Sequence, residues 1–211
     1  MSFKAIIFDL DGVICFTDEY HYLAWKDTAD SIGVPFDRTV NNRLRGVSRM
    51  ESLDIILEKC PQPLSMAEKE VLADQKNRQY QGYLRGMTTS DLPTEVKETL
   101  DGLRQKGLRM AIGSSSKNTP LILRQIGLDG YFDAVADGNG VKRSKPAPDV
   151  FLLAAELLGD DPADCLVVED AVSGAQAAHA AGMKAACVGD AAQNQAGDYN
   201  MGSIRELLEL V

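Results

Sequence analysis

The chain begins with an unbroken apolar run that ends in two acids and a glycine. Residues 3–12 read FKAIIFDLDG, so Asp9 and Asp11 stand two positions apart, directly before Gly12. Because side chains alternate along a strand, both carboxylates project to the same side at its carboxyl end, where open parallel sheets place their ligands. Buried carboxylates need a charged partner, and a divalent cation is the natural one. The alternative is a strand followed by an ordinary Asp-Gly turn.

Two later segments offer groups that bind anions. The apolar residues 108–112 lead into Gly113-Ser114-Ser115-Ser116-Lys117-Asn118, small and hydroxylic residues at the start of an expected helix. Backbone N–H groups and hydroxyls at such a position bind phosphate oxygens. Lys145 lies in the segment SKPAPD, where two prolines stiffen the loop before the next expected helix. A fixed cation is therefore expected there.

A fourth segment repeats the pattern of the first. The apolar residues 165–168 lead into Glu169 and Asp170, which would complete the oxygen shell of Mg²⁺. Taken singly, each segment has a structural explanation: a helix cap, a solvated lysine or an Asp-Gly turn. Together, the four segments offer a nucleophile, hydroxyls, an ammonium group and carboxylates, and this combination favours a phosphoryl-transfer site.

The four segments resemble the motifs of the haloacid dehalogenase superfamily, which are DxDG, Ser or Thr, Lys and an acidic pair, in this order. The resemblance covers essentially the whole chain. It implies that Asp9 attacks phosphorus to form an aspartyl-phosphate and that Asp11 is the general acid/base. It also implies catalytic roles for Ser114 and Lys145, and an Mg²⁺ site. The implied metal ligands are Asp9, Asp11, Glu169 and Asp170.

The chemistry of phosphoryl transfer agrees with these roles. The transition state is rich in charge, so Mg²⁺ and Lys145 would neutralise the equatorial oxygens of the transferred group. Asp9 must stay ionised, and contact with the metal ensures that it does. Asp11 instead needs an available proton, which a partly apolar site closed against water would provide.

Composition excludes several other classes of protein. The chain has 211 residues, of which 45% are hydrophobic and 25% charged, and these values are ordinary for a globular protein. A net charge of −9 argues against binding to nucleic acid or to an anionic membrane. No apolar run is long enough to span a bilayer and no leader precedes the first strand, so a cytoplasmic location is expected. The cysteines show no metal-binding spacing and are expected to be reduced thiols: Cys15, Cys60, Cys165 and Cys187.

The hydrophobic pattern predicts an α/β protein with a doubly wound parallel sheet, which is Rossmann-like, and an inserted helical cap; the resemblance implies that this fold is of the haloacid dehalogenase type. Spacing is helical from residue 17 to residue 86, whereas helices and apolar strands alternate from residue 92 onward. The expected domains are a core, residues 1–16 and 87–211, and a cap, residues 17–86. The expected core elements are helices 93–106, 118–126, 148–158 and 171–181, strands 108–113, 132–136, 165–169 and 183–188, and a closing helix 203–210 after the polar segment 189–202.

The expected cap contains a basic segment, RLRGVSR, residues 43–49, followed by Glu51 and Ser52. A glycine between basic residues can bring backbone N–H groups and a guanidinium onto one anion, and Arg49 suits bidentate recognition of phosphate. The alternative is a solvated basic face capped by Ser48.

Together with Thr17, His21 and Trp25, this segment resembles the β-phosphoglucomutase family, which interconverts β-D-glucose 1-phosphate and D-glucose 6-phosphate. The resemblance implies an aspartyl-phosphate, a β-D-glucose 1,6-bisphosphate intermediate that also primes the enzyme, and sugar phosphates as the only partners of a monomer. Arg45 stands where the family often has lysine, and Phe16 where it commonly has aspartate. The implied substrate-binding residues are Thr17, His21, Gly46, Val47, Arg49, Ser52, Lys76, Ser115, Ser116, Lys117 and Asn118.

Two alternatives stay open. A sugar-phosphate phosphatase of the same fold would discharge the aspartyl-phosphate to water instead of a sugar hydroxyl. A catalytically silent metabolite-binding protein would require a broken catalytic set, but Asp9, Asp11, Lys145 and Asp170 are all present.

Overall fold

The apolar runs of the sequence form one parallel sheet. The computed structural model describes residues 3–211, and its strand order is β3-β2-β1-β4-β5-β6. The first strand lies in the middle, where it pairs in parallel with β2 on one side and with β4 on the other. The strands are β1 (Ala5–Phe8), β2 (Arg109–Gly113), β3 (Ala134–Ala136), β4 (Cys165–Glu169), β5 (Lys184–Cys187) and β6 (Tyr199–Asn200).

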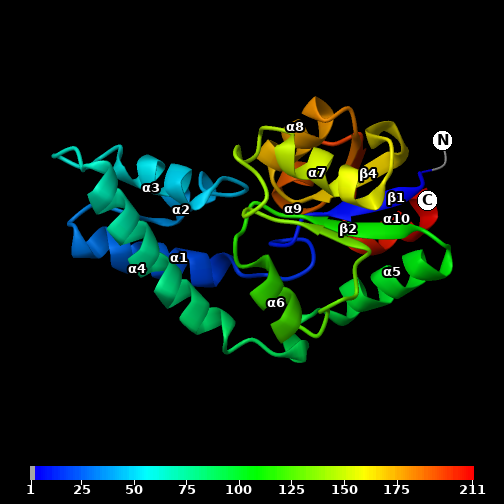
Figure 1. The fold of residues 1–211 in the computed structure, drawn as a ribbon, viewed down its shortest axis with the longest axis horizontal. Helices are drawn as coiled ribbons and strands as arrows, with labels where there is room; N and C mark the ends of the chain where they lie inside the picture. The colour runs from blue at the N-terminus through cyan, green and yellow to red at the C-terminus, as the bar shows by residue number, and fades with distance from the viewer. Residues whose placement is uncertain (1–2) are drawn as a thin grey trace.

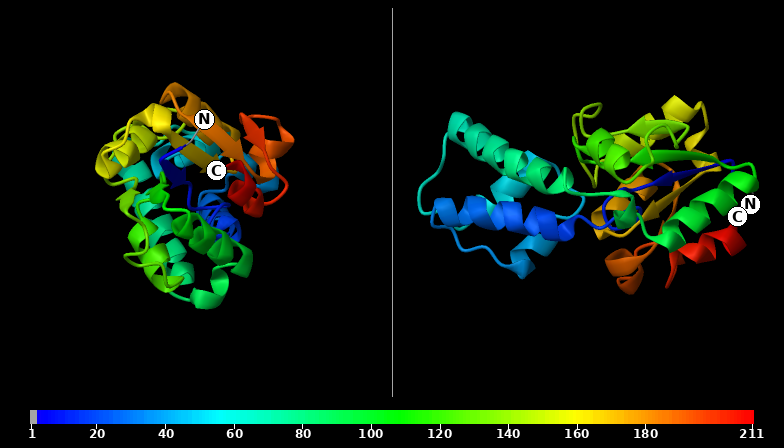
Figure 2. Two further views of the ribbon diagram at one scale, coloured as in Figure 1. Left: turned by 90° about the vertical axis from the view of Figure 1, so that its right-hand side faces the viewer. Right: turned by 90° about the horizontal axis from the view of Figure 1, so that it is seen from below.

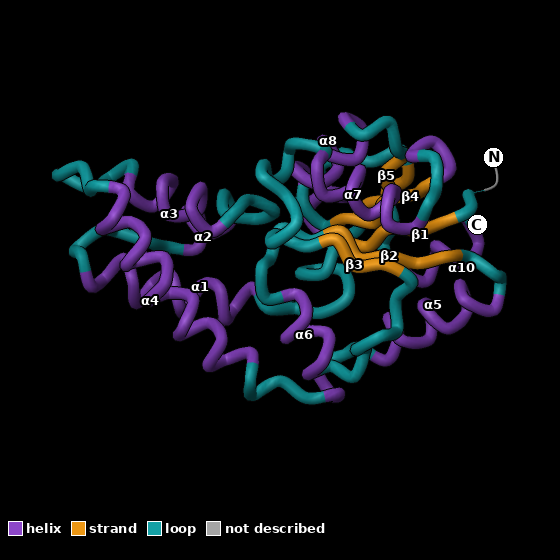
Figure 3. The backbone as a smooth tube through the Cα atoms, in the orientation of Figure 1, coloured by secondary structure: helices purple, strands orange, loops and turns teal. Residues whose placement is uncertain are grey.

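Both faces of the sheet are covered by helices, which is why its strands read as continuous apolar runs. Along β1, Ile6 and Phe8 pack against α5, α6 and α10, whereas Ala5 and Ile7 pack against α7 and α8. Figures 1 and 3 show the sheet between these two layers. The core helices are α5 (Thr94–Gln105), α6 (Thr119–Gln125), α7 (Asp149–Leu158), α8 (Val172–Ala180), α9 (Gly189–Gln193) and α10 (Leu207–Leu210).

The remaining helices form a separate group between β1 and β2, which we call the cap (residues 18–84). It lies at one end of the molecule, as Figure 1 and the right-hand view of Figure 2 show. It has an apolar cluster of its own, in which Trp25, Phe36, Leu53 and Ile56 are buried. Its helices are α1 (Asp18–Ser31), α2 (Arg38–Asn42), α3 (Arg49–Leu57) and α4 (Met66–Leu84).

The structure confirms the predicted fold class, and the predicted core strands and helices lie within two residues of the observed ones. No strand is found between residues 17 and 86, which all lie in the described part of the chain. The polar segment 189–202 contains two elements that the pattern did not predict, α9 and β6. The closing helix expected over 203–210 begins as a 3₁₀ turn, Ile204–Glu206, before α10. The predicted domain boundaries stay a prediction.

All four cysteines are free thiols, and Cys15, Cys165 and Cys187 are buried in the core. Three short 3₁₀ segments complete the described elements: Thr89–Asp91, Pro162–Asp164 and Ile204–Glu206. Between residues 3 and 211, no helix is both long and apolar enough to cross a membrane.

Two glycines give opposite predictions for stability. A Cβ at Gly113, at the end of β2, would lie 2.7 Å from Phe151 Cδ1 and 3.0 Å from Ile7 Cγ2, so Gly113→Ala should destabilise the protein by about 1–3 kcal/mol through overpacking. Gly82 lies in α4 with nothing near its Cβ position, so Gly82→Ala should stabilise the helix by about 0.5–1 kcal/mol. Urea unfolding measures both changes, and equal midpoints for the two variants would contradict the described packing.

Candidate functional site

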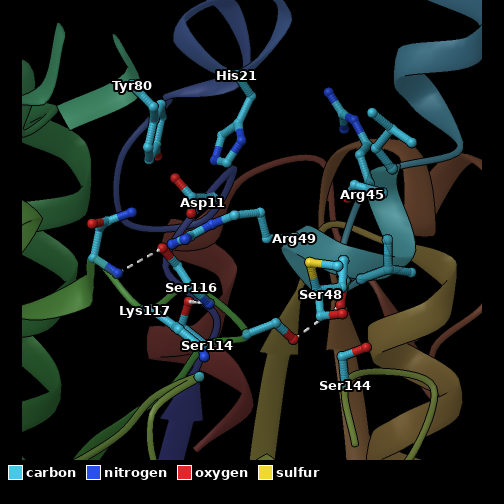
Figure 4. A pocket seen from close by; sticks show the side chains of 18 of the residues that line it. Asp11, His21, Arg45, Ser48, Arg49, Tyr80, Ser114, Ser116, Lys117 and Ser144 are labelled. Atoms are coloured by element: carbon cyan, nitrogen blue, oxygen red, sulfur yellow. Dashed lines mark hydrogen bonds between the residues drawn. The ribbon is translucent and has the colours of Figure 1, made fainter. Parts of the chain in front are cut away.

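A large cavity lies beyond the carboxyl ends of β1, β2 and β4, at the place where the strand order of the sheet reverses. Open α/β sheets place their ligands at this position, because the helices on either side of it connect to opposite faces. The cavity has a volume of about 600 Å³ and is lined by core loops on one side and by the cap on the other. In Figure 4, Tyr80 and His21 face Asp11 from the cap, whereas Ser114, Ser116 and Lys117 belong to the core.

A buried ion group lies at the core end of the cavity. Lys145 Nζ donates hydrogen bonds to Asp9 Oδ1, at 2.5 Å, and to Glu169 Oε1, and its side chain is fully buried. The ammonium group also lies 4.7 Å from the centre of the Phe151 ring. Burial alone would lower the pKa of Lys145, but the carboxylates of Asp9 and Glu169 outweigh it and hold this pKa above its usual value. Lys145 is therefore a fixed cation beside the predicted nucleophile.

Three carboxylates, two of them bonded to this lysine, lie close enough together to hold a metal ion. One oxygen each of Asp9, Glu169 and Asp170 lies within 4.8 Å of the others, and all three residues are buried. Burial, Glu169 and Asp9 raise the pKa of Asp170 to about 8, and burial above all raises the pKa of Glu169. Such crowded oxygen ligands suit a hard divalent cation such as Mg²⁺. Asp11, which the sequence also suggested as a ligand, is not in this cluster, and that role stays a prediction.

Asp11 has a different environment from Asp9. Its carboxylate accepts a hydrogen bond from the Thr17 hydroxyl, which also lies 2.9 Å from the hydroxyl of Tyr80. Burial raises the pKa of Asp11 to about 7, and the neighbouring charge of Asp9 adds to the shift although the bond from Thr17 opposes it. A carboxyl group that titrates near neutral pH can both donate and accept a proton, as an acid/base catalyst must. The structure thus places a proton-carrying group two residues from the predicted nucleophile.

The serine-rich loop after β2 forms hydrogen bonds within itself and to the cap that the sequence did not predict. Ser114 is buried, and its hydroxyl accepts the N–H of Ser116, whose own hydroxyl accepts the N–H of Asn118. Two of the backbone donors expected to meet phosphate are therefore occupied within the loop. The Asn118 side chain bonds to Gln81 and Asn77 of the cap, at 2.9 and 3.0 Å. In this structure Asn118 connects the core to α4.

The cap end of the cavity carries cations. Lys76 is buried, and its Nζ lies 2.9 Å from Nδ1 of His21 and over the rings of Trp25 and Tyr80. Burial and the nearby charge of Arg49 lower the pKa of Lys76 to about 7, and burial with the charges of Lys76 and Arg49 lowers that of His21. Among residues 3–211, no ion pair involves Lys76, whereas Arg49 lies 4.0 Å from the carboxylate of Asp74. Lys76 therefore has no carboxylate partner at this end of the cavity.

Several contacts were missed by reasoning from the sequence. The Arg45 guanidinium bonds to Asp170 at 3.0 Å and also to Asp18, so it joins the cap to the carboxylate cluster. Among these missed residues, the position of Tyr80 could have been predicted from the sequence, because it follows Lys76 by four residues and so lies on the same face of the helix. Phe16, at the position where the resemblance implied an aspartate, is 64% exposed just before the cap.

The structure brings the predicted site residues together around this one cavity, although their roles stay predictions. Thr17 and Lys145 lie behind the lining, where they bond to Asp11 and to Asp9. The predicted residues that line the cavity are Asp9, Asp11, His21, Gly46, Val47, Arg49, Ser52, Lys76, Ser114, Ser115, Ser116, Lys117, Asn118, Glu169 and Asp170.

Known proteins resemble the chain over most of its length. Residues 3–182 match the family model for haloacid dehalogenase-like hydrolases. The chain is 45% identical to a β-phosphoglucomutase from Bacillus subtilis, over 88% of this chain and 83% of that protein. It is 35% identical to the fructose-1-phosphate phosphatase YqaB from Escherichia coli, over 87% and 95%. A crystal structure of β-phosphoglucomutase from Clostridium difficile matches with a TM-score of 0.91 and 35% identity, over 97% of this chain and 93% of that one.

The low pKa of Lys76 predicts a pH-dependent effect of its replacement. Between the folded value of about 7 and the ordinary value of 10.5, the unfolded chain binds a proton that the folded chain does not, so stability from this group rises with pH over that range. Lys76→Met keeps the apolar stem and removes the charge. It should therefore stabilise the protein at pH 7 by an amount on the order of 4 kcal/mol, and the gain should shrink towards pH 10.5.

Thermal unfolding between pH 6 and pH 10 measures this effect. The matched control is Lys59→Met, which replaces an exposed lysine of the cap. A gain that is independent of pH, or one that the control shares, would contradict a strained ammonium at position 76.

Proposed function

The chain belongs to the haloacid dehalogenase-like hydrolase family, and from this membership and a cavity that has a core end and a cap end we propose that it is a β-phosphoglucomutase. It would interconvert β-D-glucose 1-phosphate and D-glucose 6-phosphate. One observation carries the proposal beyond family likeness: Arg49 and Lys76 line the cap end of one cavity, and Lys145 lies just behind the lining at its core end. A mutase must hold two phosphates of one sugar, whereas a phosphatase needs to hold only one.

In this proposal Asp9 carries the transferred group. A carboxylate oxygen of Asp9 attacks phosphorus while the bond from phosphorus to the sugar oxygen breaks, and Asp11 gives that oxygen a proton. In the other half-reaction a sugar hydroxyl passes its proton to Asp11 and attacks the aspartyl-phosphate. Lys145 donates a hydrogen bond to Asp9 and balances charge on the transferred oxygens. An Mg²⁺ ion held by Asp9, Glu169 and Asp170 would supply further charge neutralisation.

The cap would hold the phosphate that does not react. Arg49 suits bidentate binding of a phosphate, and a phosphate near Lys76 would oppose the burial and the charge of Arg49 that lower the pKa of this lysine. Both ends of the sugar react in turn, so glucose 1,6-bisphosphate forms in the cavity and also serves as the priming donor. The monomeric state and the cytoplasmic location stay predictions.

A sugar-phosphate phosphatase is the second candidate, and the similarity to a fructose-1-phosphate phosphatase supports it. It would use the same Asp9 and Asp11, with water in place of the second hydroxyl. The cations at the cap end would then serve only to bind substrate.

Product analysis separates the two candidates. With β-glucose 1-phosphate, Mg²⁺ and a catalytic amount of glucose 1,6-bisphosphate, we expect glucose 6-phosphate to accumulate with little free phosphate, because the cap cations hold the intermediate for the second transfer. A coupled dehydrogenase assay measures the first product and a molybdate assay the second. Stoichiometric release of phosphate would favour the phosphatase.

The variant Arg49→Ala tests the two-ended cavity within the same assay. Acetyl phosphate has no second group for the cap to bind, so its hydrolysis should change little. Mutase kcat/KM should instead fall about 100-fold, because the variant cannot form the charge-assisted hydrogen bonds that hold the distal phosphate in the transition state. Equal decreases on the two substrates would argue against a phosphate site in the cap.

A further inference from the structure

Three loops of the core each hold a serine against the same segment of the cap. The Ser115 hydroxyl donates to the carbonyl of Gly46 at 2.9 Å, and the Ser173 hydroxyl donates to the carbonyl of Arg45 at 3.1 Å. The Ser144 hydroxyl donates to the carboxylate of Glu51. We call the cap residues 45–51 the docking segment.

Each of these serines lies within three residues of a predicted catalytic or metal-binding residue. Ser115 follows Ser114 after β2, Ser144 precedes Lys145 before α7, and Ser173 lies three residues after Asp170 at the start of α8. Three separate loops that build the core end of the cavity thus also bond to the cap. Any movement of the docking segment therefore acts directly on the loops that position the reacting groups.

The acceptors on the cap side are held firmly. Glu51 is the third residue of α3 and forms a capping box with Ser48, whose N–H donates to Glu51 Oε2 at 2.9 Å. Burial would raise the pKa of Glu51, but bonds from Ser144 and Ser48 outweigh it and keep this pKa below its usual value. The carboxylate that Ser144 meets is therefore ionised and fixed by the start of α3, next to Arg49.

The docking segment also approaches the core too closely for a side chain. Gly46 has a φ of +76°, and a Cβ on it would overlap the Ser173 hydroxyl and lie 3.7 Å from Lys145 Cδ. Glycine at this position lets the backbone carbonyls reach the serines. The close approach and the three hydrogen bonds together form one interface, in which the docking segment packs directly against the core.

We propose that Ser115, Ser144 and Ser173 are positioning residues that dock the cap on the core and so set how often the aspartyl-phosphate meets water. Hydrogen bonds from neutral hydroxyls exchange readily with those of water, so such docking is reversible. This suits a mutase, because the bisphosphate must turn end for end between the two transfers, and the cap must open without becoming trapped. The readout of products rests on the proposed function, whereas the docking itself does not.

The double variant Ser144→Ala/Ser173→Ala tests the proposal without changing any predicted substrate contact. In the absence of two docking bonds, we expect the ratio of free phosphate to glucose 6-phosphate and the KM for β-glucose 1-phosphate each to rise roughly tenfold, with a smaller change in kcat. The matched control is Ser31→Ala, because the Ser31 hydroxyl also donates to a backbone carbonyl, that of Thr28, but within the cap. This control should behave as the wild type.

Small-angle X-ray scattering of the substrate-free proteins measures docking directly. The radius of gyration should increase in the double variant but not in the control, and Ser144→Thr, which keeps a hydroxyl, should stay close to the wild type. An unchanged radius together with unchanged product partition would overturn the proposal. Should the double variant unfold, the single variants Ser144→Ala and Ser173→Ala give the same comparison. If the wild type releases only phosphate, the proposed mutase activity is refuted. The scattering result would still show whether the serines dock the cap on the core.

Discussion

The buried ion group of Lys145, Asp9 and Glu169 is the interaction on which the rest of the structure depends. It joins the ends of β1 and β4 to the loop before α7, so three segments far apart in the sequence meet at one point. Burying these charges is unfavourable unless all of them stay paired, and removing one partner leaves an uncompensated charge. With Asp170 beside it, the group has more carboxylates than cations and suits a divalent cation. Burial and the nearby charges of Glu169 and Asp9 together raise the pKa of Asp170.

The two ends of the cavity have opposite electrostatic character. The core end concentrates carboxylates around one lysine, whereas the cap end brings Lys76, His21 and Arg49 together. A phosphate at the core end needs added cations, and a phosphate at the cap end would give Lys76 the anionic partner that it lacks among residues 3–211. The same asymmetry lets a protein with a net charge of −9 attract anionic substrates to one place.

The sequence predicts those parts of this site that depend on local pattern. Asp9 and Glu169 follow apolar strands, and parallel strands bring their carboxyl ends to one edge, so their proximity could be inferred. The bond from Arg45 to Asp170 and the docking serines could not, because they depend on how the cap lies over the core. Likewise, α9 and β6 lie in a polar segment with no hydrophobic period, and β6 is defined by its pairing with β5. The occupied amides of the loop after β2 show that hydroxyls can also bond within their own loop.

The central claim is that a carboxylate oxygen of Asp9 picks up and returns the phosphoryl group. Its most direct test is to mix the protein and Mg²⁺ with labelled glucose 1,6-bisphosphate, to quench in acid, and to map the phosphorylated peptide by mass spectrometry. We expect one acyl phosphate, on Asp9, and none in the variant Asp9→Asn. Label on a serine or histidine, or label that persists in Asp9→Asn, would contradict the account.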